Sequence, residues 1–305
     1  MASLVDLFDG EEETPPNVMF FDMSTIALAA ALQEFPEQKI QVGMLRHIVL
    51  NSIKFNLKKF KADYPEVILC FDNAENGYWR RDYGYYYKKN RGEARKESTF
   101  DWQGYFDAIN EIKKELALNM PYYTLDCARI EADDIIGVLT KRFTLQGRLV
   151  MIVASDGDYY QLHKFPGVKQ WAPNLKKFVD KKKDGTPIEF LMTKVLKGDR
   201  KDNVAGVKCR SDYWYTRIEG ERAPSISSKL IEACLDDGPE KHLTEDELKR
   251  YKENQIMIDM DYIPEDIQSQ IITAYESFKV PGRNKIYPYF VSKKLTLLSR
   301  DLNQF

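Results

Sequence analysis

Val18-Met19-Phe20-Phe21-Asp22 is a run of four apolar residues that ends in an aspartate, and two later stretches repeat this design. Residues 67–72 are apolar up to Asp72, and residues 149–156 again lead from apolar residues to Asp156. Continuous apolar runs of this length are typical of strands that are covered on both faces, as in parallel sheets. The three stretches therefore predict strands of one buried parallel sheet.

Helical patterns lie between these stretches and dominate the later part of the chain. Residues 44–55 and 131–143 carry apolar residues at helical spacing. Strands that alternate with helices predict an α/β fold with a central, mostly parallel sheet flanked by helices. After residue 185 the patterns are mostly helical, at residues 193–196, 227–235, 245–258 and 265–278. We therefore expect a tail over residues 1–16, an α/β domain over 17–185 and a smaller, mainly helical C-terminal domain over 186–305.

The composition excludes several classes of protein. Of the 305 residues, 43% are hydrophobic and 30% are charged, which permits a sizeable core and argues against disorder. The formal net charge of −2 neither indicates nor excludes nucleic acid as a partner. No apolar run reaches the roughly 18 residues of a membrane span, and the acidic N-terminus does not resemble a secretory signal. Four cysteines without a Cys-x-x-Cys pair, and only three histidines, argue against structural zinc and a disulfide framework. We expect a monomeric protein of the reducing cytoplasm, without a membrane partner.

Three aspartates stand where the predicted strands end, namely Asp22, Asp72 and Asp156. Ligands of open α/β sheets bind beyond the carboxyl ends of the strands, so these side chains should converge there. Each acid alone has a structural explanation, because aspartates cap helices and acids suit the first helical turn. Further acids in short motifs could join the three: Glu131, Asp133, Asp134, Asp158, Asp199 and Asp202.

Together these acids predict a metal centre. Several carboxylates at one sheet edge repel each other, and their pKa values rise unless cations are present. Hard divalent cations with oxygen ligands solve this problem, and Mg²⁺ is the usual ion, for which Mn²⁺ can substitute. So many acids exceed the needs of one ion and predict two ions about 3.5–4 Å apart, as in nucleases and polymerases. A phosphatase of the dehalogenase type is disfavoured, because its Asp-x-Asp motif needs an acid where Ser24 stands.

Two basic segments accompany the acids. Residues 79–96 carry seven basic residues against two acids, with tyrosines between them, and they follow Asp72 closely. Interleaved tyrosine and lysine or arginine suit single-stranded nucleic acid, whereas the plainer interpretation is a solvated charged helix. Residues 194–210 carry six basic residues, and Gly198 and Gly206 frame a turn that could follow the backbone of a duplex.

Six motifs, taken in order, resemble those of the flap endonuclease and 5′ nuclease family, and within it those of T-even-like bacteriophages. They are Phe21-Asp22, Cys70-Phe71-Asp72, Tyr87-Lys88-Lys89-Asn90-Arg91, Glu131-Ala132-Asp133-Asp134, Ser155-Asp156-Gly157-Asp158 and Gly198-Asp199-x-x-Asp202-Asn203-Val204-x-Gly206-Val207. The family resemblance covers residues 17–210, and that to the phage branch runs to the C-terminus. It implies a helical arch above the acids and a helix–three-turn–helix element that binds DNA.

The resemblance also implies an activity and its residues. The activity is 5′-to-3′ removal of RNA primers and adjacent DNA from lagging-strand fragments, together with flap cleavage, on RNA–DNA hybrids and forked or flap duplexes. The first Mg²⁺ would be held by Asp22, Asp72, Glu131, Asp133 and Asp156, and the second by Asp158, Asp199 and Asp202, with Asp134 nearby. Lys88 would stabilise the scissile phosphate, helped by Arg91 and Arg80. Contacts to nucleic acid are expected from Arg80, Tyr87, Lys88, Lys89, Arg91, Arg200, Lys201, Lys208 and Arg210.

One stretch departs from the family pattern. The duplex-binding turn usually continues as Gly-Ile-Gly-x-Lys, which can also hold a monovalent cation. This chain instead continues through residues 208–215 and reaches its next glycine only at Gly220. We therefore expect an enlarged turn without that cation site, and we expect Tyr213, Trp214 and Tyr215 to be core residues.

The N-terminal tail carries Leu4, Leu7 and Phe8 at the spacing of one helical face. Short apolar anchors of this kind dock in the groove of a partner. They also resemble the peptides by which proteins of such phages engage their sliding clamp, so clamp binding by residues 3–10 is our hypothesis. The alternative is a tail that packs on its own domain. The resemblance further implies that the C-terminal domain contacts a single-strand DNA-binding protein.

Two other functions stay open at this stage. A non-catalytic accessory protein that binds forked or flap DNA would keep the basic segments, but it would not need the costly cluster of acids. A toxin-like ribonuclease on a related sheet is usually much smaller and would leave residues 185–305 unexplained. The sequence therefore favours a structure-specific 5′ nuclease that works by two-metal phosphodiester hydrolysis.

Overall fold

The computed structural model describes residues 15–180 and 185–305 and confirms the mostly parallel sheet. Its six strands lie in the order β3-β2-β1-β4-β5-β6. Neighbouring strands are parallel from β3 to β5, and β6 runs antiparallel to β5 at the edge. The strands are β1 (Val18–Asp22), β2 (Glu66–Cys70), β3 (Tyr123–Leu125), β4 (Val150–Val153), β5 (Val168–Ala172) and β6 (Lys177–Phe178). The three apolar runs of the sequence are thus β1, β2 and β4, side by side at the centre.

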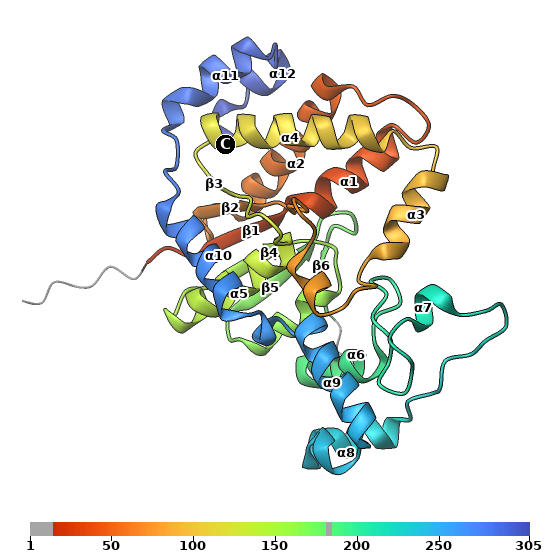
Figure 1. The fold of residues 1–305 in the computed structure, drawn as a ribbon. Helices are drawn as coiled ribbons and strands as arrows, with labels where there is room; N and C mark the ends of the chain where they lie inside the picture. The colour runs from red at the N-terminus through yellow and green to blue at the C-terminus, as the bar shows by residue number, and fades with distance from the viewer. Residues whose placement is uncertain (1–14, 181–184) are drawn as a thin grey trace, which may run out of the picture.

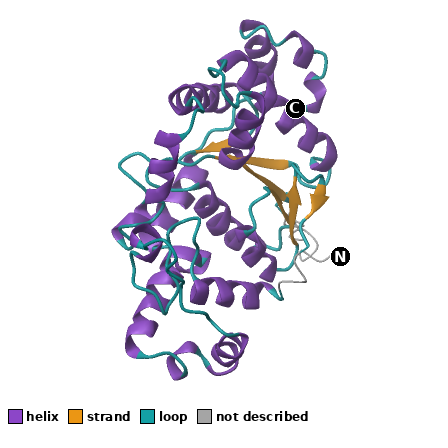
Figure 2. Ribbon diagram, turned by 90° about the vertical axis from the view of Figure 1, so that its right-hand side faces the viewer, coloured by secondary structure: helices purple, strands orange, loops and turns teal. Residues whose placement is uncertain are grey.

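Helices flank this sheet, as Figures 1 and 2 show. They are α1 (Met23–Glu34), α2 (Val42–Phe60), α3 (Lys89–Glu97), α4 (Trp102–Asn119), α5 (Ala132–Leu145), α6 (Pro187–Lys197), α7 (Tyr213–Thr216), α8 (Ser228–Asp237), α9 (Glu245–Ile258), α10 (Glu265–Ser277), α11 (Ile286–Ser292) and α12 (Thr296–Ser299). Short 3-10 helices are η2 (Trp79–Asp82), η3 (Asp158–Lys164), η5 (Pro239–Lys241), η6 (Met260–Tyr262), η7 (Arg283–Lys285) and η8 (Leu302–Gln304).

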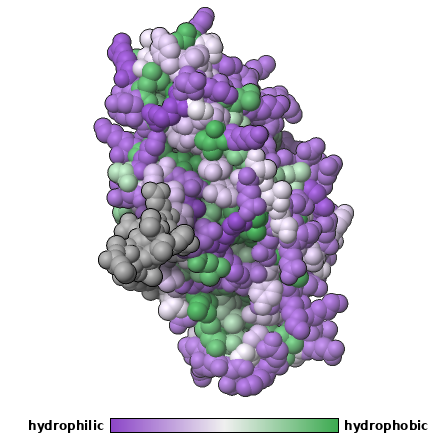
Figure 3. Space-filling view, turned by 90° about the vertical axis from the view of Figure 1, so that its left-hand side faces the viewer, coloured by the Kyte–Doolittle hydropathy of each residue, from purple (hydrophilic) through white to green (hydrophobic). Residues whose placement is uncertain are grey.

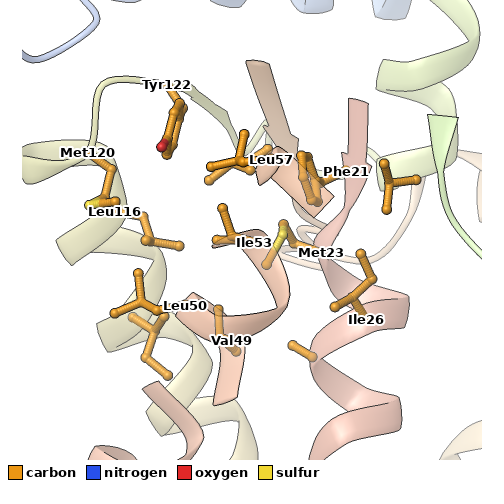
Figure 4. Packing of buried hydrophobic residues seen from close by; sticks show 14 of the residues in the cluster. Phe21, Met23, Ile26, Val49, Leu50, Ile53, Leu57, Leu116, Met120 and Tyr122 are labelled. Carbon is orange, nitrogen blue, oxygen red and sulfur yellow. The ribbon is translucent and has the colours of Figure 1, made fainter. Parts of the chain in front are cut away.

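Side chains of β1 alternate between two cores, as the geometry of a strand requires. Met19 and Phe21 join a cluster with α1, α2 and α4, part of which Figure 4 shows. Val18 and Phe20 face the opposite cluster, which α5 and α10 cover. Both faces are apolar, so the strand reads as an unbroken hydrophobic run in the sequence.

The C-terminal helices divide into two groups. Helices α6, α8 and α9 share a small apolar cluster of their own that includes Leu196 and Tyr251. Helices α10 to α12 return to the sheet, where Ile271 enters one core and Phe290 the other. The apolar cores therefore include residues from both sides of position 185, where the sequence predicts a domain boundary.

The turn after α6, which the sequence predicts to be enlarged and which we call the enlarged turn over residues 198–220, is closed at its start by a backbone bridge. Asp199 and Val204 form an isolated antiparallel bridge, with both backbone hydrogen bonds at 2.8 Å. Gly198 has φ +75°, and a Cβ there would collide with the backbone of Val204 and Ala205, so the tight turn requires glycine. Beyond Gly206 the chain passes through α7 and a loop before α8 begins.

Among the described residues, no helix combines the length and the apolar character needed to cross a membrane. Figure 3 shows one face of the molecule, on which hydrophilic side chains predominate and hydrophobic ones form small groups.

Phe290→Ala is expected to lower the free energy of unfolding by about 3–5 kcal/mol, because it empties a fully buried site. The neighbouring Val291 is 55% exposed, so Val291→Ala is the matched control and should change stability little. Urea unfolding of both variants measures the difference. Equal, small effects would contradict the docking of α11 on the core.

A candidate active site at the carboxyl end of the sheet

Asp22 and Asp72 stand where two central strands end, and both are tied down by hydrogen bonds. Asp22 is buried and accepts from the backbone N–H of Thr25 at 2.9 Å, which caps α1. The hydroxyl of Tyr159 donates to its other oxygen at 3.0 Å. Asp72 accepts from the backbone N–H of Ala132 at 2.8 Å, which joins the end of β2 to the start of α5. Asp22 therefore caps a helix, as the structural explanation predicts, and it also lies with Asp72 at the carboxyl end of the sheet.

The first turn of α5 adds three carboxylates. Glu131 and Asp134 form a capping box, in which the backbone N–H of Glu131 donates to Asp134 at 3.1 Å. One oxygen from each of Glu131, Asp133 and Asp134 lies within 4.8 Å of the others. Oδ1 of Asp133 is buried and has no hydrogen-bond partner. A buried carboxylate oxygen without a hydrogen bond, among other carboxylates, fits a hard cation.

Arg80 and Trp79 hold this turn from the side of the protein interior. Nη2 of Arg80 lies 2.7 Å from Asp134, and its Nη1 lies 3.1 Å from Glu131. The indole N–H of Trp79 donates to Asp134 at 2.8 Å. Arg80 is buried, although the sequence predicts that it contacts nucleic acid. The structure gives it carboxylate partners inside the protein, where it orients Glu131 and Asp134.

Lys88 and Tyr87 reach Glu131 from the segment that leads into α3. The ammonium of Lys88 forms an ion pair with Glu131 and lies 3.5 Å from Asp202. The hydroxyl of Tyr87 donates to Glu131 at 2.8 Å, and its ring is buried, so this ring is not presented to a base as the sequence predicts. Arg91 lies 2.5 Å from Asp202. Lys88 has φ +54°, a left-handed conformation that is costly for a lysine and is found at functional sites.

A second group of acids surrounds Lys194 of α6. Lys194 forms ion pairs with Asp158 and, at 2.8 Å, with Asp199. The backbone N–H of Asp158 donates to Asp156 at 2.9 Å, and Asp156 is exposed. The sequence marks Lys194 only as the start of a basic segment. Its position five residues before Asp199, on the helix that enters the turn, is the signal that could have identified it.

The two groups of acids meet in one pocket. Its acidic lining consists of Asp133, Asp158, Asp199 and Asp202, with Arg80 and Lys194 beside them. Nine carboxylates were expected to converge, and the contacts above bring all of them to this end of the sheet. They come from segments far apart in the sequence, so only the fold assembles them.

Burial and neighbouring charges shift the pKa values of some of these acids in opposite directions. Burial, and then the charges of Glu131 and Asp22, raise the pKa of Asp72 to about 7. Burial also raises the pKa of Asp133 well above its ordinary value, with repulsion from Glu131 in support. Glu131 is buried too, but Lys88 and Arg80 outweigh that effect and lower its pKa to about 2. The site thus carries more carboxylates than its own cations can neutralise, which favours added cations.

The other predicted residues lie outside this pocket. Arg200, Lys201, Lys208 and Arg210 are exposed on the enlarged turn. Arg210 pairs with Glu221 at 2.5 Å. The expectation of three core aromatics is wrong in part, because Tyr213 is buried whereas Tyr215 is 41% exposed. Leu4, Leu7 and Phe8 lie outside the described residues.

Comparison with known proteins yields two family profiles that meet near the predicted boundary. The profile described as 5′-3′ exonuclease, N-terminal resolvase-like domain, matches residues 25–187, and that described as T4 RNase H, C terminal, matches residues 185–305. The ribonuclease H of Enterobacteria phage T4 is 52% identical over 299 residues, which are 97% of this chain and 98% of that protein. A 5′-3′ exonuclease of Buchnera aphidicola is 30% identical over 173 residues, which are 54% of each chain.

Solved structures share the fold at low sequence identity. The 5′-exonuclease of phage T5, solved with divalent zinc ions, has a TM-score of 0.61 at 15% identity and covers 86% of this chain and 100% of its own. A variant of the T5 flap endonuclease, solved in a pseudo-enzyme–product complex with DNA and metal ions, has a TM-score of 0.59 at 15% identity. It covers 91% of this chain and 97% of its own.

Asp72→Asn is expected to stabilise the protein at pH 8 in EDTA by about 1–3 kcal/mol, because it removes a charge that burial disfavours. The folded pKa of about 7 lies above the ordinary value of 3.8, so wild-type stability falls as the pH rises between these values. The advantage of the variant should therefore grow from pH 5 to pH 8.

Urea unfolding in EDTA at both pH values measures this difference. The exposed Asp63→Asn is the matched control and should behave as wild type at either pH. A variant that is less stable than wild type at pH 8 would contradict the charge balance given for Asp72.

Proposed function

The chain belongs to the 5′-3′ exonuclease family, and on that basis we propose that it is a Mg²⁺-dependent, structure-specific 5′ nuclease. The observation that carries the proposal is the gathering of carboxylates beyond the end of the sheet, where Asp133, Asp158, Asp199 and Asp202 line one pocket and Glu131 and Asp134 lie against Asp133. Oδ1 of Asp133, a residue that lines this pocket, is buried without a hydrogen bond and lies 4.0 Å from Arg80. An oxygen-only donor set suits Mg²⁺, with Mn²⁺ as a substitute, and does not suit a zinc site of histidine and cysteine.

The acids divide into two sets for two ions. We assign Asp22, Asp72, Glu131, Asp133 and Asp156 to the first ion, directly or through water, and Asp158, Asp199 and Asp202 to the second. Asp134 lies nearby, and its contacts with Arg80 and Trp79 support a role in orienting the turn of α5. The two ions would supply a more acidic attacking water and positive charge for the phosphate oxygens.

The chain's own cations complete the site. Lys88 is held between Glu131 and Asp202, from where it can turn toward a scissile phosphate. Arg91, which pairs with Asp202, is the second catalytic cation. Positive groups placed in advance where negative charge develops stabilise the transition state of phosphoryl transfer.

The substrate is a nucleic acid with a free 5′ end next to a duplex. We propose that the protein removes RNA primers and adjacent DNA from lagging-strand fragments during phage DNA replication, 5′ to 3′, in the cytoplasm of the bacterial host. Its 52% identity to the phage T4 ribonuclease H supports this role. The exposed Arg200, Lys201, Lys208 and Arg210 would contact the duplex backbone, and Lys89 the single strand.

Asp156→Asn is expected to lower the rate of flap cleavage by about a hundredfold or more, while the affinity for flap DNA holds. The change removes a carboxylate from the first ion and with it part of the transition-state stabilisation. A 5′-labelled flap with an RNA or a DNA end, in a titration of Mg²⁺, measures rate and product size together.

The exposed Asp236→Asn is the matched control and should cleave as wild type. If wild type bound the flap but cut nothing at any Mg²⁺ or Mn²⁺ concentration, the protein would be a non-catalytic fork-binding protein instead. Retention of activity in Asp156→Asn would contradict the role given to that residue.

We also propose two protein partners, a sliding clamp for the N-terminal tail and a single-strand DNA-binding protein for the C-terminal domain. Removal of residues 1–12, which include Leu4, Leu7 and Phe8, should abolish stimulation by the clamp and leave distributive cleavage unchanged. Cleavage assays with and without the phage clamp measure both properties. Clamp stimulation that survives the deletion would rule out the tail as the docking peptide.

A further inference from the structure

We propose that Tyr85, Tyr86 and Tyr215, with Lys89, form an aromatic platform on which an unpaired base of the substrate stacks, next to the candidate active site. The inference rests on the proposed function, because it names the part of a nucleic acid substrate that this surface would bind. It extends that function by assigning a contact to the single-stranded arm, because Tyr87, which lines the acidic pocket, is buried and donates its hydroxyl to Glu131.

The short segment that carries Lys88 presents two different surfaces. Tyr87 and Lys88 are buried and face Glu131, as described above. Tyr85 is 68% exposed, and Nζ of Lys89 lies 3.1 Å from the centroid of its ring. The ring of Tyr86 meets that of Tyr85 edge to face, with centroids 5.1 Å apart. Aromatic rings that pack on each other and on a cation in solvent are not part of a core.

The enlarged turn supplies the third ring. Tyr215 of α7 lies with its ring centroid 5.3 Å from that of Tyr86, at an interplanar angle of 39°. Its hydroxyl donates to Glu93 of α3 at 2.7 Å. Figure 1 shows α3 and α7 approaching each other, although they are far apart in the sequence. The stretch that departs from the family pattern therefore completes a surface that begins at the base of α3.

The position of the aromatic platform links it to the reaction. The backbone N–H of Lys88 donates to the carbonyl of Asp202 at 2.9 Å, so the segment and the turn are joined beside the pocket. The side-chain amide of Asn90 donates to the carbonyl of Lys201 at 3.3 Å. A base on the platform would thus belong to a nucleotide close to the phosphate that Lys88 reaches.

The chemistry of the surface suits a single strand of any sequence. Every base has a flat face that stacks on an aromatic ring, and lysine or arginine beside the ring neutralises the phosphates. Lys89 adjoins the rings, and Arg200 and Arg217 lie 5.6 and 5.4 Å from the ring centroid of the neighbouring Trp214.

A competing explanation is that Tyr215 only fastens α3 to the turn through the hydrogen bond from its hydroxyl to Glu93.

Two double variants separate stacking from fastening. Tyr85→Leu with Tyr215→Leu removes both exposed rings, whereas Tyr85→Phe with Tyr215→Phe keeps the rings and removes the hydroxyls, including the donor to Glu93. We measure the affinity of each in EDTA by fluorescence anisotropy, on a duplex with a single-stranded 5′ arm and on the same duplex with blunt ends. Unfolding midpoints equal to wild type establish that both variants are folded.

The leucine variant should bind the armed duplex at least about fivefold more weakly, the lower limit for loss of one stacked base, and the blunt duplex as wild type. The phenylalanine variant should match wild type on both. Unchanged affinity of the leucine variant for the armed duplex would overturn the proposal. An equal loss of affinity for the armed duplex in both variants would overturn the proposal and indicate that Tyr215 only fastens α3 to the turn through Glu93.

A fluorescent base tests the contact itself. With 2-aminopurine at the first unpaired position of the arm, stacking on a ring should quench emission on binding to wild type and to the phenylalanine variant. The leucine variant, at saturating protein, should not produce this quenching. These measurements need no cleavage, so failure of wild type to cut a flap in Mg²⁺ would overturn the nuclease proposal and leave the stacking result to be judged separately.

Discussion

Repulsion among carboxylates at one edge of the sheet is the constraint on which the rest of the structure depends. Burial already opposes the charge of Asp72 and Asp133, and neighbouring acids raise their pKa values further. Arg80, Lys88 and Lys194 offset part of this cost by ion pairs with the acids. Added cations would offset the rest of this cost, which fits a site of metal chemistry rather than a source of stability.

This constraint also explains how the parts of the chain are joined. The segment before α3 is held to the pocket by Lys88 and Tyr87 on Glu131, and α6 is held there by Lys194 between Asp158 and Asp199. Charge therefore links the segment before α3 and helix α6 to the acids of the pocket. If Lys88 binds a substrate phosphate, as we propose, its contacts with Glu131 and Asp202 would change, and the binding and positioning of the substrate would be coupled through the same groups.

Burial is the property that the sequence revealed least well. Arg80 and Tyr87 sit in a basic, tyrosine-rich segment that suits an exposed binding surface, and yet both are buried beside Glu131. Tyr215 lies in an aromatic stretch that the sequence assigns to the core, and yet its side chain is exposed. In both cases the local pattern is ambiguous, because a side chain of mixed polar and aromatic character is buried or exposed according to partners far away in the chain.

The sequence by itself determined the strands β1, β2 and β4, the aspartates at their ends and the order of the motifs. Unbroken apolar runs can be satisfied only between two layers of helices, and parallel strands direct their carboxyl ends to one edge. The tertiary structure alone decided which cation meets which acid, why Lys194 belongs to the site, and that Tyr86 and Tyr215 share one surface. Apart from the ion pair of Lys194 with Asp199, these contacts join residues that the sequence separates by tens of positions or more, and their distances depend on packing that no local pattern encodes.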